Sequence, residues 1–148
     1  MNHLEKHVMC LLKSFRHWTG KDLIPLNVPE EEWVKQVWES PRVIVSHGVE
    51  NDPILNYGNQ KALELWEMSW EEFVKTPSRL TAETVNQEER QRLLDRVSRF
   101  GYIDDYRGIR ISHSGKRFVI EEAVVWNLLD EHQKYYGQAA TFQKWRYL

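Results

Sequence analysis

The stretch from Arg117 to Asp130, with the sequence RFVIEEAVVWNLLD, constrains the fold more than any other part of the chain. It is rich in Val, Ile, Phe and Trp, the residue types that favour β-strands. Both of its alternating faces are mostly apolar, so a strand here must be covered on both sides. Turn sequences flank it, and strand-like segments lie beyond them at Tyr102 to Ser112 and Lys134 to Trp145. We therefore predict a three-stranded antiparallel meander.

The upstream part of the chain has the pattern of helices around a short hairpin. Apolar residues on one helical face predict an amphipathic helix, and a proline at a favourable first position opens a second one. Two short β-runs and three short-to-medium helices follow. The predicted ranges are 3–18 and 29–40 for the first two helices, 42–47 and 54–57 for the hairpin, and 59–100 for the later helices.

This order of elements predicts an α+β fold. The expected architecture is a PAS-like five-stranded antiparallel sheet with helices on one face, plus two N-terminal helices. We assign residues 1–40 to a helical extension that packs on the sheet or forms a dimer interface, and residues 41–148 to the PAS-like domain. An extension on the outer face would explain why the central strand is apolar on both sides.

Several strings in the chain resemble the MEKHLA domain family, and they occur in that family's order. They are VSHGVENDPILNYGNQKALELWEMSWEEF, PSRLTAE, GYIDDYRGIRISHSGKRF and VWNLLDEHQKYYGQAATFQKW, while LLKSFRHWTGKDL resembles the leader of small stand-alone bacterial members. The family is related to PAS domains and also occurs at the C-terminus of plant class III homeodomain-leucine zipper transcription factors. The resemblance implies a sensory or regulatory module, with no established enzymatic activity. This chain lacks a homeodomain and a zipper heptad, so the DNA-binding part of the plant role does not carry over.

Charge and composition argue against two classes of partner. The chain has 148 residues with a formal net charge of −2, and its basic residues are interleaved with acidic ones, which gives no electrostatic footprint for nucleic acid. No apolar run approaches the roughly 20 residues of a membrane helix. The single cysteine, Cys10, excludes an internal disulfide framework. We therefore expect no nucleic-acid or membrane partner, and a cytoplasmic location.

The sequence does not contain a recognisable catalytic set, so we expect a protein that is not an enzyme. There is no G-x-S-x-G string, no glycine-rich phosphate loop and no metal-ligand string. Asp104 and Asp105 with His113 could be read as an acid–base set, but adjacent strand residues point to opposite faces. His3 and His7 have the spacing of a metal-binding pair but lack a third ligand. An enzyme on a related α+β cone fold stays an alternative.

The cofactor is left unknown. PAS-type sensors use flavin, haem or small organic ligands. The only cysteine lies in the leader, which argues against covalent flavin photochemistry but leaves non-covalent flavin open. No histidine lies between Gly48 and Ile111, so the central helices offer no axial ligand for haem.

Polar residues on apolar strands mark the candidate pocket. Glu121 and Glu122 are consecutive, so one of them is expected to point toward the helix-covered side, with Arg79 as its partner. With Gln138 or Asn127, such a group could orient a small ligand, although an internal ion pair that only holds helices to the sheet is the competing interpretation. The predicted ligand-binding residues are Tyr57, Trp66, Phe73, Arg79, Leu94, Glu122, Trp126 and Gln138. Alternation does not tell which face of the central strand is inward.

The functional hypothesis is a sensor-like, non-catalytic module that binds a small-molecule ligand or a protein partner and forms a homodimer. The alternative is a dimerisation or protein-interaction module without a ligand. The first predicts a cavity between helices and sheet, whereas the second predicts a collapsed core.

Overall fold

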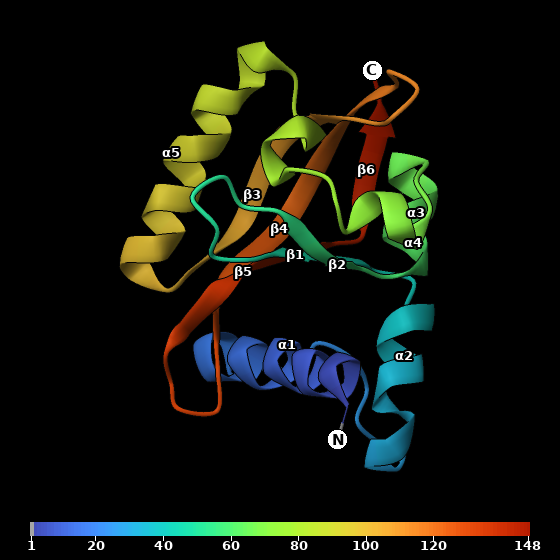
Figure 1. Cartoon of the computed structure of the whole chain (residues 1–148), viewed down its shortest axis with the longest axis vertical. Coiled ribbons are helices and arrows are strands. Elements are labelled where there is room, and N and C mark those ends of the chain that lie inside the picture. The colour runs from blue at the N-terminus through green and yellow to red at the C-terminus, as the bar shows by residue number, and fades with distance from the viewer. Residues whose placement is uncertain (1) are drawn as a thin grey trace.

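One antiparallel sheet runs through the centre of the computed structural model, which describes residues 2–148 (Figure 1). Its strand order is β2-β1-β5-β4-β3, and β6 pairs with β4 outside that path. The strands are β1 (Val43–His47), β2 (Leu55–Gly58), β3 (Tyr102–Ile111), β4 (Arg117–Leu129), β5 (Tyr135–Phe142) and β6 (Lys144–Tyr147). The predicted α+β fold around one antiparallel sheet is confirmed, with six strands in place of the expected five because the predicted last strand is divided into β5 and β6.

Helices cover both faces of the sheet. The elements are α1 (His3–Thr19), the 3₁₀ turn η1 (Glu30–Glu32), α2 (Trp33–Glu39), α3 (Gln60–Trp66), α4 (Trp70–Phe73), the 3₁₀ turn η2 (Ser78–Thr81) and α5 (Thr84–Phe100). Figure 1 shows α1 on one side of the strands, with α3, α4 and α5 on the other. The N-terminal helix therefore lies on the outer face, where it contacts β4.

Two separate apolar cores explain why the central strand is apolar on both faces. One core joins the sheet to α3, α4 and α5, and β4 contributes Phe118, Ile120, Ala123 and Val125 to it. The other joins the sheet to α1 and α2, and there β4 contributes Trp126 and Leu128. Burial of an apolar side chain stabilises a fold by roughly 1.5–3 kcal/mol, so leaving either face bare would be costly.

A bulge at Glu122 overturns the predicted alternation of the central strand. Glu122 has φ of 53°, and the residues on its two sides, Ile120 and Ala123, belong to the same core although they are three positions apart. The extra residue shifts the face of everything that follows it. As a result Trp126 faces α1, not the helices of the other face. β3 has a second irregularity at Asp105, with φ of 56° and a register shift.

Candidate functional site

A cavity of about 60 Å³ lies between the sheet and the helices α3 to α5. Since one water molecule occupies roughly 10–15 Å³ on this measure, the cavity has room for roughly four to six waters or a ligand of similar size. Apolar side chains from several elements form most of its wall, among them Trp66, Phe73, Leu94 and Phe142. A polar part of the wall is formed by His47, Ser78, Thr81, Arg90, Arg110 and Gln138.

Two buried arginines are the unusual feature of this wall. Arg90 on α5 and Arg110 on β3 are each only 7% exposed. Arg90 donates to the hydroxyl of Ser78, and Arg110 donates to the Ile109 carbonyl at 2.9 Å and to the Tyr106 hydroxyl at 3.2 Å. Within residues 2–148, neither guanidinium lies within ion-pair distance of a carboxylate.

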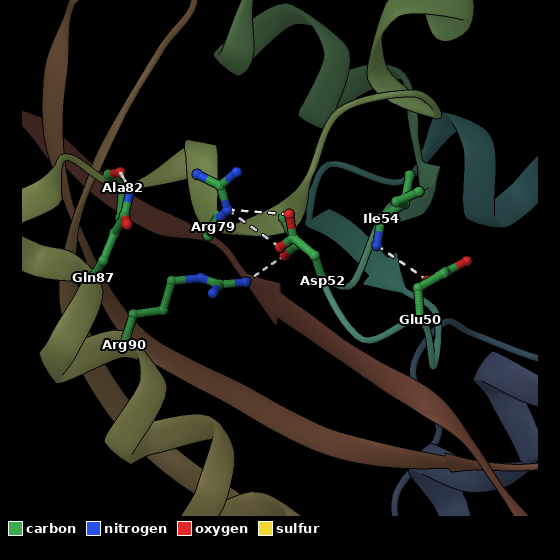
Figure 2. A network of polar contacts seen from close by, with 8 residues as sticks. Glu50, Asp52, Ile54, Arg79, Ala82, Gln87 and Arg90 are labelled. Carbon is green, nitrogen blue, oxygen red and sulfur yellow. Dashed lines mark hydrogen bonds and ion pairs between the residues drawn. The ribbon is translucent and has the colours of Figure 1, made fainter.

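The nearest acidic side chains are engaged elsewhere. Asp52 pairs with Arg79 at 3.2 Å, and Figure 2 shows this pair beside Arg90, which extends from α5 toward the same loop. Glu89 accepts a hydrogen bond from the Tyr106 hydroxyl at 2.8 Å. Burial and then the charge of Arg110 lower the pKa of Arg90 to about 10, while the charge of Asp52 acts in the opposite direction. Arg90 therefore remains a cation at neutral pH, without a carboxylate partner.

His47 presents an unpaired ring nitrogen in the same cavity wall. Its Nδ1 is 3.1 Å from the Gly48 carbonyl, which fixes the proton on Nδ1 because a carbonyl only accepts. Its Nε2 is buried without a hydrogen-bond partner. Burial lowers the pKa of His47 to about 4, so the ring is neutral at pH 7 and Nε2 carries a free lone pair.

Gln138 and Asn127 form a polar link from the cavity to the end of α5. The Gln138 amide donates to the Leu94 carbonyl at 3.0 Å and to Asn127 Oδ1 at 3.2 Å. The Asn127 amide donates in turn to the Val97 carbonyl at 2.9 Å. These amides add side-chain hydrogen bonds to carbonyls near the end of α5, and the Val97 carbonyl also accepts from the Gly101 backbone N–H at 2.8 Å.

The structure brings four of the predicted site residues together at the cavity: Trp66, Phe73, Leu94 and Gln138. It does not bring the other four there. Tyr57 and Trp126 lie in the core under α1, Trp126 because of the bulge at Glu122. Arg79 pairs with Asp52, and Glu122 pairs with Lys144 at 2.7 Å, both at the surface. The predicted inward pairing of Arg79 with a strand glutamate is therefore wrong.

Sequence reasoning missed Arg90, Arg110 and His47. A signal was present for both arginines. Arg90 precedes Leu93, Leu94 and Val97 by three, four and seven residues, which places it on their helical face. Arg110 lies two residues beyond Gly108 and four beyond Tyr106, on the inward side of β3.

A family model of the MEKHLA domain matches residues 5–147. The chain belongs to the MEKHLA domain family. This confirms the resemblance, and the matched range includes α1 as well as the sheet. The division into residues 1–40 and 41–148 stays a prediction.

One protein is similar to this MEKHLA domain in sequence, and two solved structures have a similar fold. The homeobox-leucine zipper protein ATHB-9 of Arabidopsis thaliana is 22% identical over 149 residues, which span 95% of this chain but only 17% of that protein. The PAS domain of a protein from Colwellia psychrerythraea has a TM-score of 0.66 at 15% identity, covering 80% of this chain and 95% of that one. The light-state dimer of the fungal blue-light photoreceptor Vivid gives 0.62 at 12% identity, covering 90% of each chain.

A flavin does not fit this MEKHLA domain in the conformation described. Drug-sized ligands and cofactors occupy pockets of roughly 300–1,000 Å³, whereas the cavity here holds about 60 Å³. Cys10 lies on α1, where its thiol contacts the Leu129 carbonyl at 3.0 Å, on the face of the sheet opposite the cavity.

Among residues 2–148, no three metal-ligating side chains gather at one point. No helix in this range combines the length and the apolar character that crossing a bilayer demands.

Two buried histidines make the stability of this MEKHLA domain depend on pH. Burial lowers the pKa of both His47 and His7 to about 4. The unfolded chain binds these protons below about pH 6.5, whereas the folded protein does not, so stability is complete above pH 6.5 and is lost as the pH falls toward 4. We expect a loss of about 2 kcal/mol for each histidine between pH 7 and pH 5.

Urea unfolding of the wild type and of His7→Gln at pH 7, 6 and 5 measures how the free energy of unfolding depends on pH. The substitution should reduce the pH dependence by about half, since His47 still contributes its share. Substitution of the exposed His132 by glutamine is the control and should leave the wild-type profile unchanged. A profile that is flat between pH 7 and pH 5 in the wild type would contradict the burial of both rings.

Proposed function

We propose that this MEKHLA domain is a non-catalytic sensory module that binds a small ligand in the cavity between the sheet and α3 to α5. The observation that carries the proposal is the polar wall of the cavity, in which His47 Nε2 has no hydrogen-bond partner and the buried Arg90 and Arg110 have no carboxylate within ion-pair distance among residues 2–148. A purely structural core would be filled by apolar side chains or by paired ones. We further propose that occupancy is reported to a protein partner, with a second copy of this chain as the first candidate.

A hydrogen bond between α1 and the sheet supports the proposal that α1 reports whether the cavity is occupied. The Trp18 indole donates to the Asn127 carbonyl at 2.9 Å, and the Asn127 side chain is bonded to Gln138 in the cavity wall. A change at the cavity therefore has a short covalent and hydrogen-bonded route through β4 to the N-terminal helix. Under this proposal residues 1–40 are the output segment of a cytoplasmic homodimer.

Native mass spectrometry of gently purified protein tests ligand binding. Ala140 is on β5 and contributes to the cavity wall, so Ala140→Leu should fill much of the space. The wild type should carry a non-covalent adduct of roughly 100 Da, a mass that matches the room in the cavity, and should lose it on denaturation. Ala140→Leu should appear at its bare mass, while Val124→Leu, on the α1 side of the sheet, should keep the adduct.

The result that contradicts the proposal is a wild type found only at its bare mass, with a melting temperature that no small molecule changes. The alternative of a protein-interaction module without a ligand would then be favoured. Light scattering tests the partner separately, because a homodimer should have about twice the 17.8 kDa mass of one chain. A monomer at all concentrations would contradict the homodimer.

A further inference from the structure

Most exposed arginines of this chain have acidic partners. Those within ion-pair distance of an Asp or Glu are Arg16, Arg79, Arg92, Arg107, Arg117 and Arg146. The exposed Arg96 and Arg99 and the half-buried Arg42 have no such partner among residues 2–148. The two buried ones, Arg90 and Arg110, have only neutral partners among residues 2–148. This is the reverse of the usual pattern, because a buried charge needs a counter-charge far more than an exposed one does.

The guanidinium groups of Arg90 and Arg110 belong to the wall of one cavity. There Arg90 donates to Ser78 and Arg110 donates to Tyr106, and both of these partners also lie in the cavity wall. Two like charges buried side by side are stabilised by an anion between them. A carboxylate matches a guanidinium in plane and spacing and accepts two parallel hydrogen bonds.

The other residues that line the cavity indicate which class of anion fits it. Trp66, Phe73 and Phe142 offer apolar surface, which suits a carbon body better than an inorganic ion. His47 Nε2 is an acceptor without a donor, so it fits a ligand that carries a hydroxyl group. The volume of about 60 Å³ limits the ligand to roughly half a dozen heavy atoms.

We propose that the cavity binds a short hydroxycarboxylate, with its carboxylate held by Arg90 and Arg110 and its hydroxyl donating to His47 Nε2. This rests on the proposed ligand-sensing function and specifies the chemistry of that same cavity. The hydrogen bonds that Arg90 and Arg110 already make leave further N–H groups of both guanidiniums for the ligand.

Thermal unfolding with four probes at equal ionic strength tests the ligand class. The probes are lactate, propionate, lactamide and sodium chloride. Lactate should raise the melting temperature by about 3 to 6 °C at ten times its Kd. Propionate, which lacks the hydroxyl, should bind at least about tenfold more weakly, and neutral lactamide and chloride should produce no shift beyond that of buffer.

Variants on the same helix test the site. Arg90→Met removes an unpaired buried charge, so the variant should fold and melt at or above the wild-type temperature without ligand. It should lose the shift with lactate. Arg92→Met removes an exposed arginine that pairs with Glu88, and it should keep the full shift. Arg110→Met should behave as Arg90→Met does.

Each remaining outcome overturns the proposal in a distinct way. A shift with lactamide equal to that with lactate would show that charge is not recognised, and the cavity would remain a site for a neutral ligand. If sodium chloride raised the melting temperature of the wild type but not that of Arg90→Met, the cavity would be a site for inorganic anions. A shift with none of the carboxylates would exclude this ligand class, while the adduct in native mass spectrometry would still decide on ligand sensing itself.

Discussion

Replacing Asn59 by aspartate is expected to destabilise the protein by about 4 kcal/mol, although the two side chains have nearly the same shape. Asn59 is fully buried before α3, and its side chain makes four hydrogen bonds. Its Oδ1 accepts from the backbone N–H groups of Ile44 at 3.1 Å and Ala62 at 3.2 Å. Its Nδ2 donates to the carbonyls of Val37 at 3.1 Å and Arg42 at 2.8 Å.

This one amide therefore joins the end of α2, the start of β1 and the N-terminus of α3. Aspartate would keep both accepted bonds but would turn a buried negative oxygen toward two carbonyl oxygens. Urea unfolding at pH 7 measures the loss. Ser69→Ala is the matched control, because Ser69 caps α4 at an exposed position and its removal should cost only about 1 kcal/mol. A cost for Asn59→Asp no larger than that of the control would show that the four bonds are not made together.

Truncating Trp126 to alanine is expected to cost about 3–5 kcal/mol. Trp126 is completely buried between the sheet and α1, where its ring meets that of Phe15 edge to face at a centroid distance of 4.9 Å. The substitution would leave a large hole in the core beneath α1. Phe100→Ala is the control at an exposed site, where the change should stay within about 0.5 kcal/mol.

The same variant tests on which side of the sheet this tryptophan lies. If Trp126 packs only on α1, Trp126→Ala with Phe15→Ala should cost less than the sum of the two single substitutions, because both empty one space. Ligand binding in the opposite cavity should then persist wherever the variant is folded. Additive costs, together with loss of the ligand, would place Trp126 in the cavity after all.

The fold could be predicted largely because local signals agree with it. Asn59 has a typical capping side chain and caps α3, while the Ser69 and Glu72 capping box starts α4. The long apolar run of β4 required cover on both faces, and the two cores supply it. Each of these signals spans only a few residues, so a single sequence contains it.

The site could be predicted only in part, because one residue of β4 decides which side chains share a face. The bulge at Glu122 reverses the alternation, and no feature of the run Glu121–Glu122 in the sequence distinguishes a bulge from a regular strand carrying one inward glutamate. Regular alternation therefore places Trp126 on the wrong face. An inward glutamate would need a cationic partner, which favours Arg79, whereas the residue that faces inward is Arg90, bonded to the neutral Ser78.

A high-resolution crystal structure of the gently purified protein would show whether the cavity holds a ligand. We expect an open cavity between the sheet and α3 to α5, with density for a small molecule in contact with the guanidiniums of Arg90 and Arg110. The contradicting result is a closed cavity in which Arg90 has turned outward to share Asp52 with Arg79, because the buried charge would then have its partner within the chain.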